Sequence, residues 1–400
     1  MNMNHRPCDA EPLPEQLRVF HSAAAEQVRQ FHLGMAGYAE TPLRELKGLA
    51  GTLGLGQLWV KDESLRFGLN AFKVLGGSYA MGRLLAERDG IQPEELTFER
   101  LISRNRAEKI TFITATDGNH GRGVAYTAAQ LHHRCIVLLP AHTAEERVRN
   151  IAALGAEAVV TDLVYDDAVR LAARMAKENG YLLVQDTAWP GYEQIPLWIM
   201  QGYMTMADEC LRQMKTPPTH LVLQAGVGSM AAAVAEYFAN ACPKTAMKVI
   251  IVEPEQADCF ARTARSGKGI CRVPGEMNSM MAGLCCGEPS TLAWEILRRR
   301  AAWYVTIPDG VAALGMRVLG NPLPGDPRII SGESGASTTG FVVDLMRRPD
   351  LAAVRGELEI GPDSSVLCIS TEGDTDRENY RAVVWNGHCP YPEKQNFVQA

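Results

Sequence analysis

The chain of 400 residues carries 40 Lys and Arg against 46 Asp and Glu, has a formal net charge of -6, and is 46% hydrophobic and 22% charged. These values are ordinary for a globular protein and exclude a disordered, collagen-like or coiled-coil chain, while a length beyond roughly 250–300 residues predicts two domains or one large α/β body. The acidic balance argues against a nucleic-acid partner, and without a signal peptide or an apolar run of about 20 residues we expect a cytoplasmic protein that does not enter a membrane.

The first half of the chain is predicted to alternate strands with helices after a mixed segment that ends near residue 55. A strand over residues 57–61, a turn at 68–70 and a helix over about 73–88 come first. From residue 110 onward, the expected strands are 110–114, 135–139, 158–161 and 182–184, and the expected helices are 123–132, 143–154 and 166–178. Thr143 and Glu146 form a capping box for the second of these helices. Such alternation predicts a parallel sheet with right-handed crossovers.

The second half repeats this pattern after a helix over about 197–214. Its expected strands are 221–223, 248–252, 303–306 and 366–370, again separated by helical stretches. The fold class is therefore α/β, with two parallel sheets. Loops at the carboxyl ends of parallel strands converge on a cleft, so we expect the chemistry to lie in those loops.

The segment NAFK at residues 70–73 places Lys73 at the start of a predicted helix, beside an aromatic residue and after a glycine-containing turn. A lysine that forms a Schiff base must be held near its electrophile and be partly desolvated. From this segment alone, an ordinary surface lysine is the favoured interpretation.

The segment TATDGNHG at residues 114–121 lies between a predicted buried strand and a helix. It brings together a hydroxyl, a carboxylate, a carboxamide and backbone amides, which suits binding of a substrate carboxylate and of a ring hydroxyl. The alternative is a simple turn in which Asp117 or Asn119 only caps the helix. A second carboxylate, Asp186, stands in the segment QDTAW at 185–189, where it either serves the site or caps a turn before Pro190.

The segment QAGVGSM at residues 224–230 follows an apolar strand and precedes an Ala-rich helix. Glycines let backbone amides approach an anion, and the helix N-terminus favours negative charge, so this loop is a candidate phosphate cradle. It matches neither the nucleotide-triphosphate loop nor the dinucleotide fingerprint. A tight turn without a ligand remains the alternative.

The ten cysteines show no C-x-x-C pair and no metal-type spacing, so we expect mostly free thiols and no metal site. Cys259, Cys271, Cys285 and Cys286 lie within one short region. A local disulfide among them stays open, beside the simpler interpretation that they pack in the interior.

The three glycine-containing loops, in their order and spacing, resemble those of the fold-type II pyridoxal-phosphate enzymes, the group of serine and threonine dehydratases, cysteine synthase and the tryptophan synthase β chain. The resemblance covers most of the chain from about residue 41. It implies a large cofactor-binding domain of residues 1–88 and 204–400, a small domain of residues 89–203 that carries the substrate loop, an active site between them, and a homodimer.

The same resemblance assigns roles to individual residues. Lys73 would bind pyridoxal phosphate covalently, and Asn119 would lie near its phenolic oxygen. The segment STEGDT at 370–375 would offer a hydroxyl to the pyridine nitrogen, from Ser370 or else from Thr371. The phosphate would bind to the loop that consists of Gly226, Val227, Gly228, Ser229 and Met230.

One departure from the dehydratases is informative, because they carry serine where this chain has Asp117 before GNH. The string TDGNHGRG, together with NAFK, QDTAW and STEGDT, resembles the diaminopropionate ammonia-lyases. That implies conversion of D- and L-2,3-diaminopropionate to pyruvate and two ammonia molecules. The implied catalytic residues are Lys73, Asp117 and Asp186, and the implied substrate-binding residues are Thr116, Asp117, His120 and Asp186.

Within that resemblance, Lys73 would take the Cα proton of the L isomer and Asp117 that of the D isomer. Asp117 and Asp186 would serve as acids near the departing β-nitrogen. Three alternatives stay open: a serine or threonine dehydratase, a pyridoxal-phosphate-dependent β-replacement synthase, and a small-molecule binding protein without catalysis.

Overall fold

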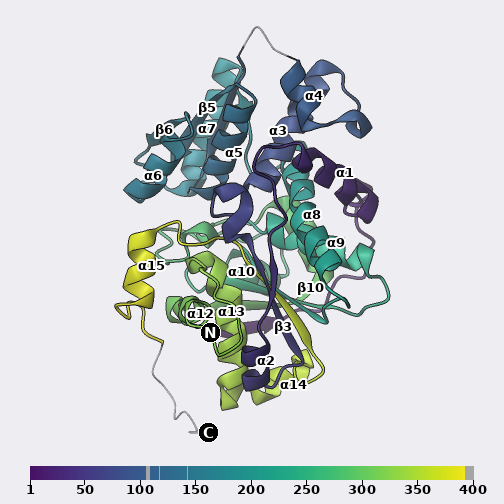
Figure 1. Cartoon of the computed structure of the whole chain (residues 1–400), viewed down its shortest axis with the longest axis vertical. Coiled ribbons are helices and arrows are strands. Elements are labelled where there is room, and N and C mark those ends of the chain that lie inside the picture. The colour runs from purple at the N-terminus through teal and green to yellow at the C-terminus, as the bar shows by residue number, and fades with distance from the viewer. Residues whose placement is uncertain (105–108, 117, 142, 392–400) are drawn as a thin grey trace.

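The structure is a computed structural model that describes residues 1–104, 109–116, 118–141 and 143–391. Two β-sheets organise the chain, the smaller at the top of Figure 1 and the larger in its lower half. The larger sheet has, in spatial order, the strands β1 (Asn2–His5), β10 (Ala301–Ile307), β9 (Lys248–Pro254), β8 (His220–Gln224), β11 (Ser365–Ser370), β3 (Gln57–Asp62) and β2 (Leu43–Glu45). The smaller sheet has the strands β6 (Glu157–Val160), β5 (Arg134–Leu139), β4 (Thr111–Ala115) and β7 (Leu182–Leu183).

The smaller sheet is parallel throughout, and the five central strands of the larger sheet are parallel as well. The two edge strands of the larger sheet are antiparallel, which the sequence did not predict. β1 comes from the extreme N-terminus, where Asn2 pairs with Thr306 of β10. Four polar or flexible residues carry no local strand signal, so only the tertiary pairing defines this strand.

Helices cover both sheets. They are α1 (Ser22–Leu33), α2 (Lys47–Leu53), α3 (Val74–Asp89), α4 (Phe98–Ser103), α5 (Asn119–Gln130), α6 (Glu145–Ala152), α7 (Tyr165–Asn179), α8 (Gln194–Gln213), α9 (Ser229–Ala241), α10 (Cys259–Ser266), α11 (Thr291–Arg300), α12 (Asp309–Gly320), α13 (Glu333–Arg347), α14 (Ala352–Leu358) and α15 (Arg377–Val384). Short 3₁₀ helices lie at Glu15–Leu17, Glu63–Gly68, Pro93–Glu95, Ala282–Leu284 and Pro349–Leu351.

The alternation of side chains along the strands divides the core into layers. Leu221 and Leu223 of β8 pack toward α8 and α9, whereas Val222 between them packs toward α12 and α13. Both faces of this strand are therefore buried, as expected for a central parallel strand. The layer that contains Leu221 and Leu223 continues through α3 and α5 to one face of the smaller sheet. The opposite face of the smaller sheet packs on α7.

One predicted helix start is wrong. The expected capping box of Thr143 and Glu146 does not form, because α6 begins at Glu145 with Ala144 as its N-cap residue and without a side-chain cap. The Thr143 hydroxyl instead donates to the carbonyl oxygen of Pro140 at 2.7 Å. The turn that closes β5 thus engages Thr143 one residue before the N-cap position.

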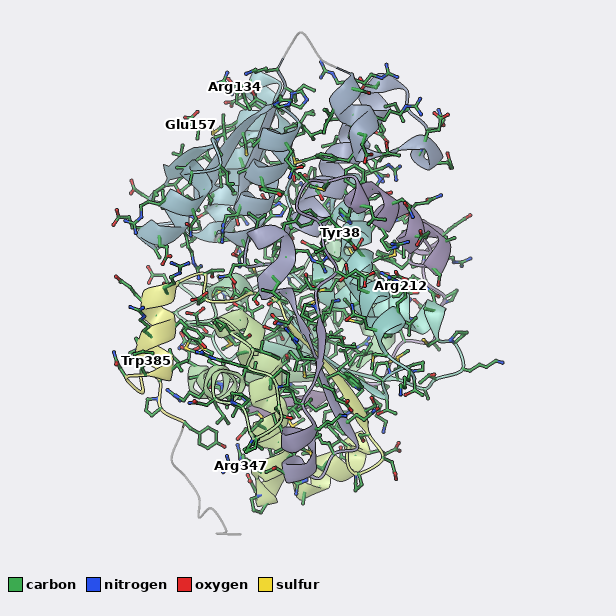
Figure 2. The ribbon with its side chains drawn as sticks, viewed as in Figure 1. Tyr38, Arg134, Glu157, Arg212, Arg347 and Trp385 are labelled. Carbon is green, nitrogen blue, oxygen red and sulfur yellow. The ribbon has the colours of Figure 1, made fainter. Side chains whose placement is uncertain are left out.

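All ten cysteines are free thiols, so the disulfide that the sequence left open is not formed. Within the described residues, no helix has the length and apolar composition of a membrane span, and no cluster of His, Cys, Asp or Glu is placed to bind a metal. Trp385, just after α15, is 76% exposed, and Figure 2 shows its side chain at the outer surface.

Candidate active site

A cavity of about 770 Å³ lies where loops at the carboxyl ends of the strands in both sheets converge. Asp186 follows β7 of the smaller sheet, and Gly226 and Thr371 follow β8 and β11 of the larger sheet. All three line the cavity together with Lys73 and Asn119. The expected convergence of strand-end loops is therefore present in the structure.

The centre of the cavity wall holds an ion pair between Lys73 and Asp186. Lys73 stands directly before α3, and its Nζ donates to Oδ2 of Asp186. The other carboxylate oxygen, Oδ1, accepts from the hydroxyl of Tyr165 at 3.3 Å. The lysine that the NAFK segment indicated is thus no ordinary surface side chain, since it is 18% exposed and faces a buried carboxylate.

Opposing effects set the pKa of Asp186. Burial raises this pKa. The positive charges of Lys73 and His120 and the hydrogen bonds from Lys73 and Tyr165 lower it by more than burial raises it, so the pKa falls to about 2. Asp186 is therefore ionised at neutral pH. In this state it can pair with a cation or accept a proton, and it has no proton of its own to donate.

The loop 226–230 forms the expected strand, glycine loop and helix. Gly228 has a φ of 85°, in the left-handed region that favours glycine, and α9 begins at the next residue, Ser229. The Ser229 hydroxyl donates to the backbone oxygen of Asp186 at 2.7 Å, which ties the loop to the neighbouring strand end. Ser229 and Met230, the first residues of α9, line the cavity, and a helix N-terminus is a suitable place for a phosphate.

The remaining wall fits an aromatic cofactor with polar substituents. Among the described residues that line the cavity, the buried side-chain atoms without a hydrogen-bond partner include the hydroxyl of Tyr203, Oε1 of Gln224 and Oγ of Ser334. Buried polar groups are normally paired, so these atoms indicate that a ligand completes the site. Lys73, the loop 226–230 and these groups together fit pyridoxal phosphate.

The two candidate partners of the pyridine nitrogen differ in position. Ser370 is the last residue of β11 and donates its hydroxyl to Oγ of Ser331 at 2.7 Å, whereas Thr371 belongs to the cavity wall. The Thr371 hydroxyl accepts from Nε2 of Gln224 at 3.2 Å. The structure therefore places the second candidate, Thr371, at the wall, with Ser370 behind it.

The other residues expected to contact the substrate support the loop from behind. Thr116 is buried and its Oγ1 accepts from the backbone N–H of Gly118 at 3.0 Å. His120 is buried as well, and its Nε2 lies 2.7 Å from the carbonyl oxygen of Val184. Neither belongs to the residues that line the cavity in the described part of the chain. Asp117 lies outside the described residues.

Several residues of the cavity wall were not predicted from the sequence. Glu333 begins α13, Glu372 follows β11, and Tyr203 comes from α8. Residues 275–280 and 282–286 also contribute to the wall, although the sequence pattern pointed only to the cysteines among them. Glu372 stands within STEGDT and had a local signal as an acid directly after a strand, whereas the others have none.

Burial and the nearby carboxylate of Glu372 raise the pKa of Glu333 to about 7, against the weaker opposite effect of hydrogen bonds and of Arg147. The carboxylate of Glu372 therefore favours the protonated form of Glu333. Glu372 uses one carboxylate oxygen, Oε2, to accept from Nδ2 of Asn119 at 2.5 Å. This contact connects α5 of the smaller sheet with the end of β11.

We expect Gly228→Val to lower the affinity for pyridoxal phosphate. An added Cβ would lie 2.3 Å from Cζ of Phe260, which is buried in the core beside the loop. The variant therefore deforms the loop through Phe260 and through its positive φ. Fluorescence titration of the apo protein measures the dissociation constant.

The matched control for this variant is Gly180→Val. Gly180 has a φ of 70° at the end of α7, with open space around an added Cβ. It shares the backbone strain but not the contact with the loop, so cofactor affinity should remain. Equal affinities of the Gly228 variant and the wild type would show that the phosphate binds elsewhere.

Comparison with known proteins gives one consistent result. The profile of the family described as "Pyridoxal-phosphate dependent enzyme" matches residues 35–369. Diaminopropionate ammonia-lyase from Escherichia coli K12 is 51% identical over 372 residues, which cover 92% of this chain and 93% of that protein. The enzyme of the same name from Salmonella typhimurium LT2 is 47% identical over 381 residues, covering 93% of this chain and 94% of its own.

Solved structures agree with these sequence matches. The Escherichia coli diaminopropionate ammonia-lyase in complex with D-serine has a TM-score of 0.92 at 47% identity, and the match covers 98% of each chain. The same enzyme in complex with an aminoacrylate-PLP azomethine reaction intermediate has a TM-score of 0.89 at 46% identity, again over 98% of each chain. Threonine deaminase from Solanum lycopersicum, at 18% identity and a TM-score of 0.71 over 96% of each chain, shares the fold.

Proposed function

Because the chain belongs to the pyridoxal-phosphate-dependent enzyme family, we propose that it eliminates ammonia from D- and L-2,3-diaminopropionate and yields pyruvate and two ammonia molecules. The fold is that of fold-type II, and the cofactor is pyridoxal phosphate. The division into a large domain of residues 1–88 and 204–400 and a small domain of residues 89–203 remains a prediction.

When bound, pyridoxal phosphate supplies a conjugated system that accepts the negative charge which develops at the substrate Cα. Lys73 would hold it covalently, and the loop 226–230 would bind its phosphate at the start of α9. Asn119 would face its ring oxygen, and Thr371 its ring nitrogen with Ser370 as the second candidate. Once the substrate amine has displaced Lys73, this lysine is free to accept the Cα proton of the L isomer.

The excess of acidic side chains in the cavity wall is the observation that supports 2,3-diaminopropionate as the substrate. Among the described residues, the wall contains six acidic side chains, those of Asp162, Asp186, Glu276, Glu333, Glu372 and Asp376, and two basic ones, those of Lys73 and Arg147. Even with Glu333 only partly ionised at neutral pH, because its pKa is about 7, the acids outnumber the bases. At neutral pH 2,3-diaminopropionate carries an ammonium group where serine carries a hydroxyl. An acidic wall attracts that extra cation, so the charge favours a diamino acid over serine or threonine.

Asp186 acts in this proposal as the partner of the β-ammonium group. When Asp186 is paired with Lys73, its pKa is lowered to about 2 and it is a carboxylate, and the substrate's β-ammonium group can take the place of the lysine cation beside it and stay protonated. A protonated amine leaves as neutral ammonia when the Cβ–N bond breaks, so no acid from the protein is needed for that step. This modifies the expectation that Asp186 is itself the proton donor.

Two related functions remain as alternatives. A serine or threonine dehydratase would use the same lysine and phosphate loop, and a β-replacement synthase would add a nucleophile such as a thiol in place of the departing group. Neither alternative has a use for the excess of acids around the cavity. The relatives described as threonine dehydratases match less of the chain, for example 27% identity over 58% of it.

Initial rates on purified substrates separate these functions. We expect kcat/KM for pyruvate formation from 2,3-diaminopropionate to exceed that from L-serine, and 2-oxobutyrate formation from L-threonine to be slower still. A thiol added to the assay should leave the rate of pyruvate formation unchanged. A preference for serine or threonine would favour the dehydratase, and diversion of the product into a thioether would favour the synthase.

We also propose a cytoplasmic homodimer. Ten free thiols support a reducing compartment. The exposed Trp385 beside α15 is a large apolar side chain of the kind that a subunit interface covers. Light scattering after size exclusion measures the mass, and a monomer at micromolar concentration would refute the dimer.

A further inference from the structure

The contact between Glu372 and Asn119 joins residues that are 253 positions apart in the sequence. Glu372 is 3% exposed, and each of its carboxylate oxygens has a separate task. Oε2 accepts from Nδ2 of Asn119 at 2.5 Å, and Oε1 accepts from the backbone N–H of Ser334 in the first turn of α13 at 3.1 Å. Glu372 thus links the N-terminus of α13 with the first residue of α5.

This contact determines which way round the Asn119 amide lies. The oxygen and nitrogen of a carboxamide have nearly the same shape, so packing alone does not orient the group. A carboxylate accepts hydrogen bonds and does not donate them, so Asn119 must turn its nitrogen toward Glu372. That nitrogen carries a second hydrogen, and Asn119 lines the cavity. Among the described residues, the Asn119 side chain makes no further hydrogen bond.

We propose that Glu372 is a positioning residue, which orients the Asn119 amide so that its second N–H faces the ring oxygen of bound pyridoxal phosphate. This rests on the proposed function, in which Asn119 lies at that oxygen. Glu372 acts through Asn119, and its second oxygen caps α13 at the same time. A donor at the ring oxygen stabilises the deprotonated form of that oxygen, which absorbs visible light, over the protonated form, which absorbs in the near ultraviolet.

The variant Glu372→Gln tests this orientation with the helix cap retained. Since the backbone N–H of Ser334 needs an acceptor, the new amide places its oxygen there and its NH₂ group toward Asn119. The Asn119 amide must then turn its oxygen toward position 372. Its nitrogen leaves the orientation that serves the cofactor.

The expected result is a loss of visible absorption relative to near-ultraviolet absorption in the cofactor-loaded protein, with a melting temperature of the apo protein near that of the wild type. Asn119→Ala should cause the same spectral change. In a double-mutant cycle, Glu372→Gln should add no further loss to Asn119→Ala, because the effect passes through that amide. An unchanged spectrum in Glu372→Gln, while Asn119→Ala shifts it, overturns the role of Glu372 and leaves the proposed function standing.

The sign of the change separates orientation from charge. Removal of a negative charge near the ring oxygen would by itself favour its deprotonated form and increase the visible band, opposite to the expected loss. The matched control is Glu333→Gln, which removes a carboxylate at the same end of α13 that accepts from Nδ2 of Asn379 instead. Measured well above pH 7, where Glu333 is ionised, it should show no loss of the visible band. An equal loss in this control overturns the proposal.

Two further outcomes also test the positioning role of Glu372. If Asn119→Ala leaves the spectrum unchanged, Asn119 does not serve the ring oxygen, and the role of Glu372 falls with it. If Glu372→Gln yields no folded protein, Glu372→Asp keeps a carboxylate near the N-terminus of α13 and withdraws it from Asn119 by one methylene. It should then shift the spectrum in the same direction, and an unshifted spectrum would refute the proposal.

Discussion

We expect Lys73→Ala to abolish turnover of both isomers of 2,3-diaminopropionate. In the proposed function this variant would lack the covalent anchor of the cofactor and the base for the L isomer, and a positioned base alone contributes about 10²- to 10⁴-fold in rate. Because the anchor serves both isomers, the D isomer should lose its turnover too. Steady-state kinetics on each isomer measures the effect, and substantial turnover without added amines would contradict the assignment of Lys73.

Two controls belong to this prediction. Lys73→Arg keeps a cation next to Asp186, but a guanidinium does not deprotonate to form a Schiff base, so it should be as inactive as the alanine variant. Lys47→Ala changes a lysine whose side chain is 78% exposed and does not line the cavity. This variant should retain full activity. Removal of the Lys73 charge also leaves Asp186 buried without this partner, so folding must be checked by circular dichroism.

We expect Asp117→Asn to lower turnover of D-2,3-diaminopropionate by about 10²- to 10⁴-fold and that of the L isomer much less. Asn retains the shape of Asp and can still cap a helix, but it has no basicity for abstraction of the Cα proton. Lys73 would continue to serve the L isomer. This prediction comes from the TDGNH segment and the resemblance that it carries.

Three outcomes of this experiment have different meanings. A selective loss on the D isomer supports the two-base proposal, and equal losses on both isomers show that Asp117 assists departure of the β-amino group instead. No loss on either isomer leaves only a capping role. The matched control is Asp162→Asn, another carboxylate of the cavity wall, which should weaken both isomers alike and keep their ratio.

Much of the fold follows from local patterns. The strands 57–61, 135–139 and 366–370 are apolar runs between turn signals, and the structure places β3, β5 and β11 there. A central parallel strand is buried on both faces, so its composition alone identifies it. Edge strands lack that signal, and for this reason β1 and β2 appear only through their tertiary pairing.

Some features of the candidate site can likewise be predicted from local sequence, whereas others depend on contacts between distant parts of the chain. Lys73 and the loop 226–230 stand at junctions of strand, glycine turn and helix, where local sequence indicates their role, and the structure places them on one cavity wall. The pairing of Asn119 with Glu372 spans 253 positions, and no local pattern shows it. The ionised state of Asp186 likewise depends on Lys73, which is 113 positions away.

The most direct test of the proposed function is the ratio of products from 2,3-diaminopropionate. The purified, cofactor-loaded enzyme is incubated with each isomer in turn, and pyruvate and ammonia are quantified in the same sample. We expect two ammonia molecules for each pyruvate from both isomers, with no turnover in Lys73→Ala. A ratio of one ammonia to one pyruvate, or no pyruvate from either isomer while serine is consumed, would contradict it.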